Sequence, residues 1–182
     1  MVFKELAGSR IRLINLNEDY LNDIHEYSIL PQFYEHLEYP PFTCIEDTKE
    51  FLAKLMKRSD DVTGHYWFIY HIDSKKVIGT IAVLDIDKRK GSAELAYGLS
   101  PLYWGNGFFS ESLKLVIDWF FELLGNHRLF IKTAVNNVNS INAVTKMGFK
   151  KEGLFRDYYL DDITKKRSDA MLLSMLKSDK PD

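Results

Sequence analysis

Hydrophobic positions along the chain follow two periods, and these periods alternate from the amino end to the carboxyl end. Alternating or continuous apolar runs, which are typical of strands, cover seven segments: residues 10–16, 65–72, 77–86, 92–99, 128–135, 149–160 and 167–176. Apolar residues at helical spacing follow four helix-start signals: Asn17, the Thr43–Glu46 capping box, Ser110 and Ser140. We therefore expect an α/β fold with seven strands and about four helices.

Composition and charge narrow the class of protein. With 182 residues, of which 46% are hydrophobic, the chain suits one compact domain over residues 1–182. The net charge of −2 argues against nucleic-acid binding, and the histidine spacing gives no reason to expect a metal site. The amino end does not look like an export signal and no segment is apolar enough to enter a membrane. The single Cys44 cannot form an internal disulfide, which indicates a cytoplasmic setting.

A glycine-rich loop, residues 103–112, joins the strand at 92–99 to the following helix. Gly105 and Gly107 allow a tight turn and a close backbone approach to a ligand, and the first N–H groups of a helix attract anions. This pattern predicts a phosphate site, although an ordinary strand-to-helix turn has the same features. The chain has no G-x-x-x-x-G-K-(S/T) motif, and Ser110 stands where G-x-G-x-x-G would have its third glycine.

A second stretch, residues 137–149 followed by Lys151-Glu152-Gly153, indicates a family. It is similar to the N-x-x-S…K-x-G-F…E-G signature of the Gcn5-related N-acetyltransferases (GNATs) of the RimJ/RimL ribosomal-protein type. Residues 104–112 resemble the acetyl-CoA loop of that family, W-G-x-G-(Y/F)-A-(T/S)-E-(A/S), and residues 94–97 resemble its E-I-G-Y strand. The matches extend from Arg10 to Leu176 in the family order, which is more specific than any single motif.

The resemblance implies a mixed, mostly antiparallel seven-stranded sheet that splays between the strands of Glu94 and Arg128, with acetyl-CoA in the gap. Leu99 would bind the pantetheine arm from one side and Asn137 from the other. The loop backbone would bind the pyrophosphate through Trp104, Gly105, Asn106, Gly107, Phe108, Phe109 and Ser110. Phe109 departs from the Ala or Gly usual in the family, and a ring directed inward would crowd the pyrophosphate.

Two residues are candidates for the chemistry that the resemblance implies, in which a free amine attacks a thioester and coenzyme A leaves as a thiolate. Glu94 is the candidate base, acting through water, unless it only orients a neighbouring group. Ser140 is the candidate proton donor to the sulfur, unless it only caps its helix. Val144 stands where many acetyltransferases have a tyrosine as the donor. Tyr158 and Tyr159 are alternatives near the other end of the gap.

The sequence gives the least information about the amine that accepts the acetyl group. Tyr34, Glu35, His36 and Glu38 lie in the loop that overhangs the acceptor in this family, where acids would attract a cationic amine; a solvated loop is the alternative. The resemblance implies the N-terminal α-amine of a protein, foremost a ribosomal one, and an α-amine has a lower pKa than lysine. Alternatives are a small amine (polyamine, amino acid or aminoglycoside) and a non-catalytic acyl-CoA sensor. A homodimer is left open.

Overall fold

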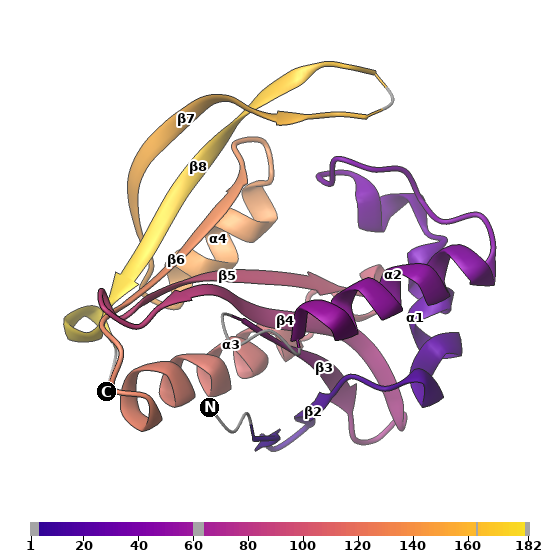
Figure 1. The fold of residues 1–182 in the computed structure, drawn as a ribbon, viewed down its shortest axis with the longest axis horizontal. Coiled ribbons are helices and arrows are strands. Elements are labelled where there is room, and N and C mark those ends of the chain that lie inside the picture. Colours follow the sequence, from indigo (N-terminus) through magenta and orange to yellow (C-terminus); the bar gives the residue numbers. More distant parts are fainter. Residues whose placement is uncertain (1–3, 60–63, 163, 181–182) are drawn as a thin grey trace.

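The computed structural model describes residues 4–59, 64–162 and 164–180, which are built around one mixed sheet (Figure 1). These described residues form eight strands in the order β1-β2-β3-β4-β5-β6-β8-β7. The strands are β1 (Leu6–Ala7), β2 (Ile11–Asn15), β3 (His65–His71), β4 (Lys76–Asp87), β5 (Ser92–Leu99), β6 (Arg128–Ala134), β7 (Lys150–Leu160) and β8 (Arg167–Leu176). The expected number of seven strands was wrong because β1, with two residues, is too short to leave a periodic pattern.

Helices cover both faces of the sheet. They are α1 (Leu21–Ser28), α2 (Ile45–Ser59), α3 (Phe108–Asp118) and α4 (Val138–Lys146). Residues of α1 and α2 share an apolar cluster with Ile14 of β2 and Phe68 of β3 on one face. Residues of α3 and α4 share the largest cluster on the other face, where a π-helical turn, Trp119–Leu123, continues α3. The expectation of an α/β fold with about four helices is confirmed.

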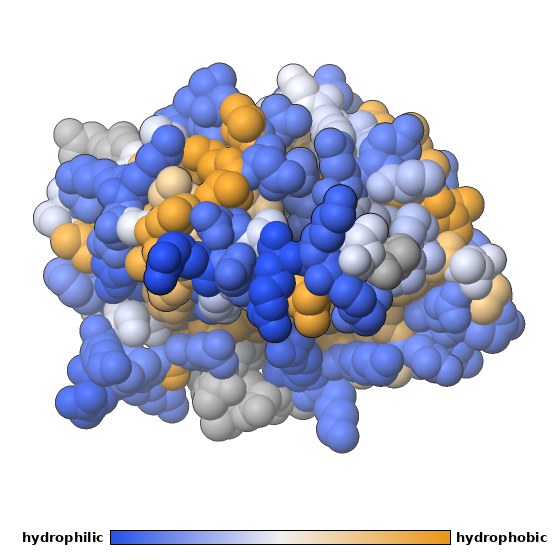
Figure 2. Space-filling view, turned by 90° about the horizontal axis from the view of Figure 1, so that it is seen from above, coloured by the Kyte–Doolittle hydropathy of each residue, from blue (hydrophilic) through white to orange (hydrophobic). Residues whose placement is uncertain are grey.

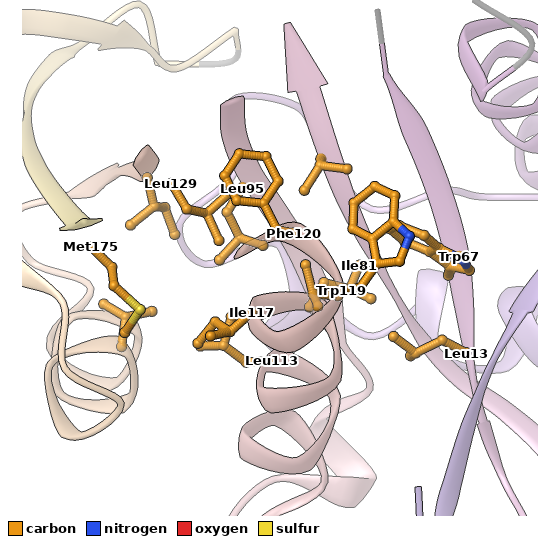
Figure 3. Packing of buried hydrophobic residues seen from close by; sticks show 14 of the residues in the cluster. Leu13, Trp67, Ile81, Leu95, Leu113, Ile117, Trp119, Phe120, Leu129 and Met175 are labelled. Carbon is orange, nitrogen blue, oxygen red and sulfur yellow. The ribbon is translucent and has the colours of Figure 1, made fainter. Parts of the chain in front are cut away.

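The apolar face of α3 fixes the position of the glycine-rich loop. Leu113, Ile117 and Phe120 are buried in the same cluster as Leu95 of β5 and Leu129 of β6 (Figure 3). Burial of such side chains stabilises the fold by about 1.5–3 kcal/mol each. Because α3 follows the loop directly, its packing holds the loop in a constant position beside the carboxyl end of β5.

The two central strands separate along their length, as the family resemblance implies. β5 and β6 pair in parallel at three positions among the described residues, the last of which joins Glu94 to Phe130. β5 continues to pair with β4 as far as Leu99, and β6 continues to pair with β8 as far as Ala134. The carboxyl halves of β5 and β6 therefore diverge, and the hairpin of β7 and β8 arches away from β5 (Figure 1).

The starts of α3 and α4 differ from the predicted ones. α3 begins at Phe108, after Gly107 in a left-handed conformation, so Ser110 lies inside the helix and is not its cap. α4 is capped by Asn137, whose Oδ1 accepts the backbone N–H of Ser140 at 3.0 Å. The alternative that Ser140 only caps its helix is therefore wrong. Asn and Ser are both good caps, so the sequence alone does not decide between them.

The first two helices begin close to the predicted positions. Asn17 Oδ1 accepts the N–H of Asp19, so Asn17 caps the short 3-10 turn that leads into α1. Before α2, Asp47 accepts hydrogen bonds from the backbone and the hydroxyl of Thr43 at 2.9 and 3.0 Å. The capping box was predicted with Glu46 as its acid, and this was wrong by one residue.

The surface seen from the side of the hairpin is mainly hydrophilic, with scattered apolar patches (Figure 2). β7 is the edge strand, and its Leu154, Phe155 and Tyr158 are exposed. None of the described helices is long and apolar enough to span a bilayer. Within the described ranges, no three His, Cys, Asp or Glu side chains are grouped so that they could hold a metal ion.

Candidate active site

A cavity of about 670 Å³ lies where β5 and β6 diverge, and its size is typical of small-molecule sites. One end, which we call the cofactor end, is bounded by Leu99, Trp104, Gly105, Phe109, Asn137 and Ser140. A second part of the lining, which we call the acceptor end, comes from residues 34–58 and includes Tyr34, Glu35, His36, Tyr39 and Arg58. Phe33 lies between the two parts, against Gly98 of β5. The structure thus brings predicted cofactor residues and predicted acceptor residues into one cavity.

The glycine-rich loop presents the N-terminus of α3. Gly105 and Gly107 have φ angles of 77° and 80°, in the left-handed region that favours glycine. No side chain caps α3, and the first N–H groups of a helix have no partner within it. A Cβ on Gly105 would meet no atom within 4 Å, which leaves space beside the backbone. These features fit the pyrophosphate of acetyl-CoA.

Four of the seven predicted loop residues do not line this cavity: Asn106, Gly107, Phe108 and Ser110. Asn106 Nδ2 donates hydrogen bonds to the carbonyls of Tyr103 and Trp104, at 3.3 and 3.0 Å. Phe108 is buried in the largest apolar cluster. Asn106 and Phe108 therefore stabilise the loop itself, and a contact with the cofactor would involve their backbone.

Arg10 and Glu111 attach the loop to the sheet beside β2. Glu111 Oε1 accepts the Arg10 N–H at 2.8 Å and the Ser9 hydroxyl at 3.1 Å, and Oε2 accepts Arg10 Nε at 2.9 Å. Arg10 Nη1 also donates to the Asn106 carbonyl at 2.9 Å. Burial opposes ionisation of Glu111, but the hydrogen bonds outweigh burial and lower its pKa. Sequence analysis missed this pair because 101 residues separate its members and nothing periodic connects them.

Glu111→Gln should weaken acetyl-CoA binding roughly tenfold, because a hydrogen bond between charged groups contributes about 1.5–3 kcal/mol and part of that energy holds the loop. The amide would place an N–H group against Arg10 Nε in place of an acceptor. Titration calorimetry with acetyl-CoA measures the change. Asp118→Asn removes a carboxylate from the far end of α3 and should bind as the wild type does. Equal affinity for all three proteins would show that Glu111 does not position the loop.

Leu99, at the end of β5, and Asn137, which follows β6 and caps α4, both line the cavity. The Leu99 carbonyl accepts the indole Nε1–H of Trp104 at 2.8 Å and has a second lone pair. Asn137 Oδ1 is used in capping α4, and its amide group still has two N–H donors. Both residues can therefore hydrogen-bond to the amides of a pantetheine arm.

The ring of Phe109 packs against Tyr97, with 4.1 Å between the ring centroids. Tyr97 in turn places its hydroxyl 2.7 Å from Ser140 Oγ. Burial raises the pKa of Tyr97 to about 12, although the Ser140 hydrogen bond opposes this. Val144, at the position of the usual tyrosine, is completely buried in the core. Sequence analysis missed Tyr97; the available signal was its match to the tyrosine of the E-I-G-Y strand.

Glu94 is not among the residues that line this cavity. Its Oε2 lies 2.9 Å from Lys132 Nζ, and Lys132 also donates to the Tyr158 hydroxyl at 2.7 Å. Burial opposes the charge of Lys132, but the hydrogen bonds with Tyr158 and Glu94 raise its pKa. Tyr159 donates to the Lys132 carbonyl at 3.0 Å. The structure thus gathers Glu94, Tyr158 and Tyr159 around Lys132, and the role of Glu94 as a base stays a prediction.

Glu38 fastens the 31–42 segment to the β7–β8 hairpin. The Leu160 N–H donates to Glu38 Oε1 at 3.0 Å, and the Asp162 N–H donates to the Glu38 carbonyl at 2.9 Å. We call these two hydrogen bonds the clasp. Tyr34, in the same segment, is buried and donates its hydroxyl to the Ser28 carbonyl at 2.8 Å. The carboxylate of Glu38 is therefore engaged by the hairpin, whereas sequence analysis expected it to contact an amine.

The acceptor end has aromatic walls and few charges. Phe42 packs against Phe51, with 5.3 Å between ring centroids, and both line the cavity. Among the described residues that line it, Glu35 and Arg58 carry the formal charges. His36 also lines it, and its buried Nδ1 has no hydrogen-bond partner among the described residues. This end suits an uncharged or singly charged group with an apolar surface.

A sheet whose central strands separate, with an uncapped helix N-terminus beside the gap, is typical of transferases that bind acyl-CoA. Comparison with known proteins identifies the family. Residues 10–150 match the family described as acetyltransferase (GNAT) domain. The chain belongs to this family and is an N-acetyltransferase that uses acetyl-CoA. A GCN5-related N-acetyltransferase from Brucella melitensis has the same fold, with a TM-score of 0.86, 24% identity and coverage of 97% of this chain and 80% of that one.

Relatives with assigned names include enzymes for different amines. The chain is 28% identical over 172 residues to the uncharacterized N-acetyltransferase p20 of Bacillus licheniformis, covering 94% of this chain and 96% of the relative. It is 25% identical to a spermidine N(1)-acetyltransferase of Vibrio cholerae, over 52% of this chain and 55% of that enzyme. It is 26% identical to the ribosomal protein uS5-alanine N-acetyltransferase of Escherichia coli, over 55% and 52%. These similarities do not determine the acceptor.

Proposed function

We propose that the protein acetylates a small primary amine that has an apolar or aromatic body. The clasp supports this most, because Glu38 joins the segment beside the acceptor end to the hairpin. A polypeptide that passed between this segment and the hairpin would have to break that connection, whereas a small molecule need not pass there. The aromatic side chains of Tyr34, Phe42 and Phe51 offer flat apolar surfaces to such a body.

The charges of the acceptor end disfavour a polyamine. Glu35 is the acid among the described lining residues, and Arg58 offsets its charge. A polyamine would bring several ammonium groups into this space, and each one near Arg58 would cost about 1 to 4 kcal/mol. A monoamine needs only one favourable contact, with Glu35 or with an aromatic face. We therefore place monoamines ahead of polyamines.

The residues of the cavity also prepare the reaction. When bound, acetyl-CoA supplies a thioester whose carbon–sulfur bond breaks as the bond from nitrogen to carbon forms. An ammonium cannot attack, and burial among aromatic rings disfavours the charged form and lowers the pKa of the bound amine. Glu94 is proposed to accept the proton through water, and Ser140, at the cofactor end, to donate a hydrogen bond to the sulfur.

The second candidate acceptor is the N-terminal α-amine of a ribosomal protein. It is favoured by the RimJ/RimL-type motifs and by the similarity to the enzyme for ribosomal protein uS5. An α-amine has an unperturbed pKa near 8, so it needs less help to become neutral than a lysine does. The free amino end of a chain can enter the cavity, whereas an internal lysine on the surface of a folded protein has less access to it.

A panel of amines tests the proposal. We expect kcat/KM for an arylalkylamine such as 2-phenylethylamine to exceed that for spermidine roughly tenfold, because of the charge repulsion described above. The panel also contains an amino acid amide, an aminoglycoside and a peptide that carries a ribosomal amino terminus. Release of free thiol from acetyl-CoA is the readout. A higher kcat/KM for the peptide than for every small amine would favour the second candidate and contradict the first.

Weakening the clasp should impair use of the amine and leave acetyl-CoA binding unaffected. In Glu38→Ala the backbone hydrogen bond from Asp162 stays, and only the side-chain hydrogen bond is removed. Glu38→Ala removes the acceptor of the Leu160 N–H, so the 31–42 segment becomes less ordered and KM for the amine should rise roughly tenfold, as for one lost hydrogen bond to a charged group. Glu38→Gln keeps an oxygen at that position and should behave nearly as the wild type. Steady-state kinetics and acetyl-CoA titration of both variants provide the comparison. An unchanged KM in Glu38→Ala would remove the main support for a covered acceptor end.

A further inference from the structure

The hydroxyls of Tyr97 and Ser140 form a hydrogen-bonded pair across the gap between the splayed strands. The two oxygens lie 2.7 Å apart, and both residues line the cavity. Tyr97 comes from β5, and Ser140 comes from the first turn of α4, which follows β6. The pair therefore connects the two sides of the site at the cofactor end, close to Leu99 and Asn137.

The surroundings favour one of the two oxygens as the donor. Tyr97 packs against Phe109 and keeps its proton at neutral pH because of burial. Either hydroxyl can donate in this pair. Because a phenol is more acidic than an aliphatic alcohol, we take Tyr97 as the donor and Ser140 Oγ as the acceptor. The backbone N–H of Ser140 is held by Asn137 Oδ1 at 3.0 Å, which fixes the first turn of α4. With its oxygen engaged by Tyr97, Ser140 must direct its own proton elsewhere.

Building on the role proposed above for Ser140, we propose that Tyr97 is a positioning residue that holds Ser140 so that the Ser140 hydroxyl donates a hydrogen bond to the sulfur of the departing coenzyme A. As the carbon–sulfur bond breaks, its electron pair stays on sulfur, and the Ser140 O–H stabilises that charge. No proton leaves Tyr97 or Ser140. The proton that the attacking amine loses passes through water to Glu94, the proposed base, and from there through water to the thiolate, so the reaction is balanced without another reactant.

This arrangement explains two departures from the family pattern. Val144 occupies the position of the usual tyrosine and is completely buried, so it cannot contact the sulfur. Phe109 replaces a small residue, and its ring forms the wall behind Tyr97. A donor polarised by a second hydroxyl is stronger than an isolated serine, because hydrogen bonds in a chain reinforce one another.

The kinetic test is a double-mutant cycle with Tyr97→Phe, Ser140→Ala and the double variant. Hydroxylamine serves as the acceptor, with the rate without enzyme subtracted, so the result does not depend on the proposed amine. We expect kcat to fall roughly 100-fold in Ser140→Ala and roughly tenfold in Tyr97→Phe, with KM for acetyl-CoA changed less than about threefold. The double variant should be no slower than Ser140→Ala. Tyr20→Phe, which removes a hydroxyl from a ring that packs on Phe68 outside the cavity lining, is the control.

A binding test is independent of turnover. At about pH 8.5, near the pKa of a free thiol, the wild type should bind coenzyme A roughly tenfold more tightly than desulfo-coenzyme A, because a hydrogen bond to a charged group is lost with the sulfur. Tyr97→Phe and Ser140→Ala should each bring that ratio close to one, and Tyr20→Phe should keep it. Thermal unfolding checks that all variants are folded. Two results would overturn the proposal. One is equal affinity of the wild type for coenzyme A and desulfo-coenzyme A. The other is a fall in kcat on Tyr97→Phe that is as large in the Ser140→Ala variant as in the wild type.

Discussion

Gly105→Glu should lower the affinity for acetyl-CoA by at least about 100-fold while the protein stays folded. The new carboxylate would lie on the loop that precedes α3, where the backbone fits a pyrophosphate. Two like charges about 4 Å apart repel each other by about 4 kcal/mol at an effective dielectric constant of 20, which exceeds the energy of a 100-fold change. Titration calorimetry with acetyl-CoA measures the loss.

The chain contains a matched control for this substitution. Gly125, after the π-helical turn that continues α3, has a φ of 65°, and a Cβ there would meet no atom within 4 Å. Gly125→Glu therefore introduces the same strain, roughly 1–2 kcal/mol, and the same charge away from the loop. It should bind acetyl-CoA as the wild type does. Gly105→Gln introduces a side chain of nearly the same size as glutamate but without its charge. If Gly105→Gln bound acetyl-CoA as weakly as Gly105→Glu, the size of the side chain alone would explain the loss of affinity.

Glu152→Gln should lower the free energy of unfolding at neutral pH by about 1.5 kcal/mol. Glu152 accepts hydrogen bonds from both terminal nitrogens of Arg128, at 2.7 and 2.5 Å, and from the Ser174 hydroxyl at 2.6 Å. These contacts join β6, β7 and β8 and lower the pKa of Glu152 to about 2. A pKa change of that size corresponds to about 3 kcal/mol, and about half is expected because 36% of the Glu152 side chain is exposed to screening.

The difference in free energy of unfolding between the wild type and Glu152→Gln should change with pH in a definite direction. Because the folded pKa of Glu152 lies below its unfolded value, its stabilisation is complete above about pH 4.5 and is lost as the pH falls toward about 2. Urea unfolding of wild type and Glu152→Gln at neutral pH and at about pH 3 should show a smaller difference at the lower pH. Glu26→Gln breaks an ion pair with Lys76 that is more exposed than the Arg128–Glu152 pair, and it should change stability by less than about 0.5 kcal/mol. An equal effect of Glu152→Gln at both pH values would exclude the ion pair as its cause.

The architecture was predictable because its signals are local. Period-two alternation placed β5 with Leu95, Tyr97 and Leu99 on one face, and helical spacing placed Leu113 and Ile117 on the buried side of α3. The glycine-rich loop was predictable for the same reason, since left-handed turns favour glycine. The splay of β5 from β6 came from the family resemblance alone, because no periodicity shows where two strands cease to pair.

The contacts that shape the site could not be predicted, because they join distant segments. Tyr97 and Ser140 are 43 residues apart, and the side chain of Glu38 meets the Leu160 N–H across 122 residues. Each partner is an ordinary polar side chain or backbone N–H group in its own segment, so no local pattern distinguishes it from a solvated one. Glu94 shows both outcomes: its strand was predicted correctly, but nothing in the sequence indicated its ion pair with Lys132.

Transfer of labelled acetyl from acetyl-CoA into a cell extract tests the central claim most directly. The extract is divided by ultrafiltration into a small-molecule fraction and a protein fraction, and each is incubated with the wild type and with Gly105→Glu. We predict that label enters an amide in the small-molecule fraction with the wild type and that Gly105→Glu transfers none. Label confined to the protein fraction would contradict a small-amine acceptor, and equal labelling by both proteins would contradict the assignment of the cofactor loop.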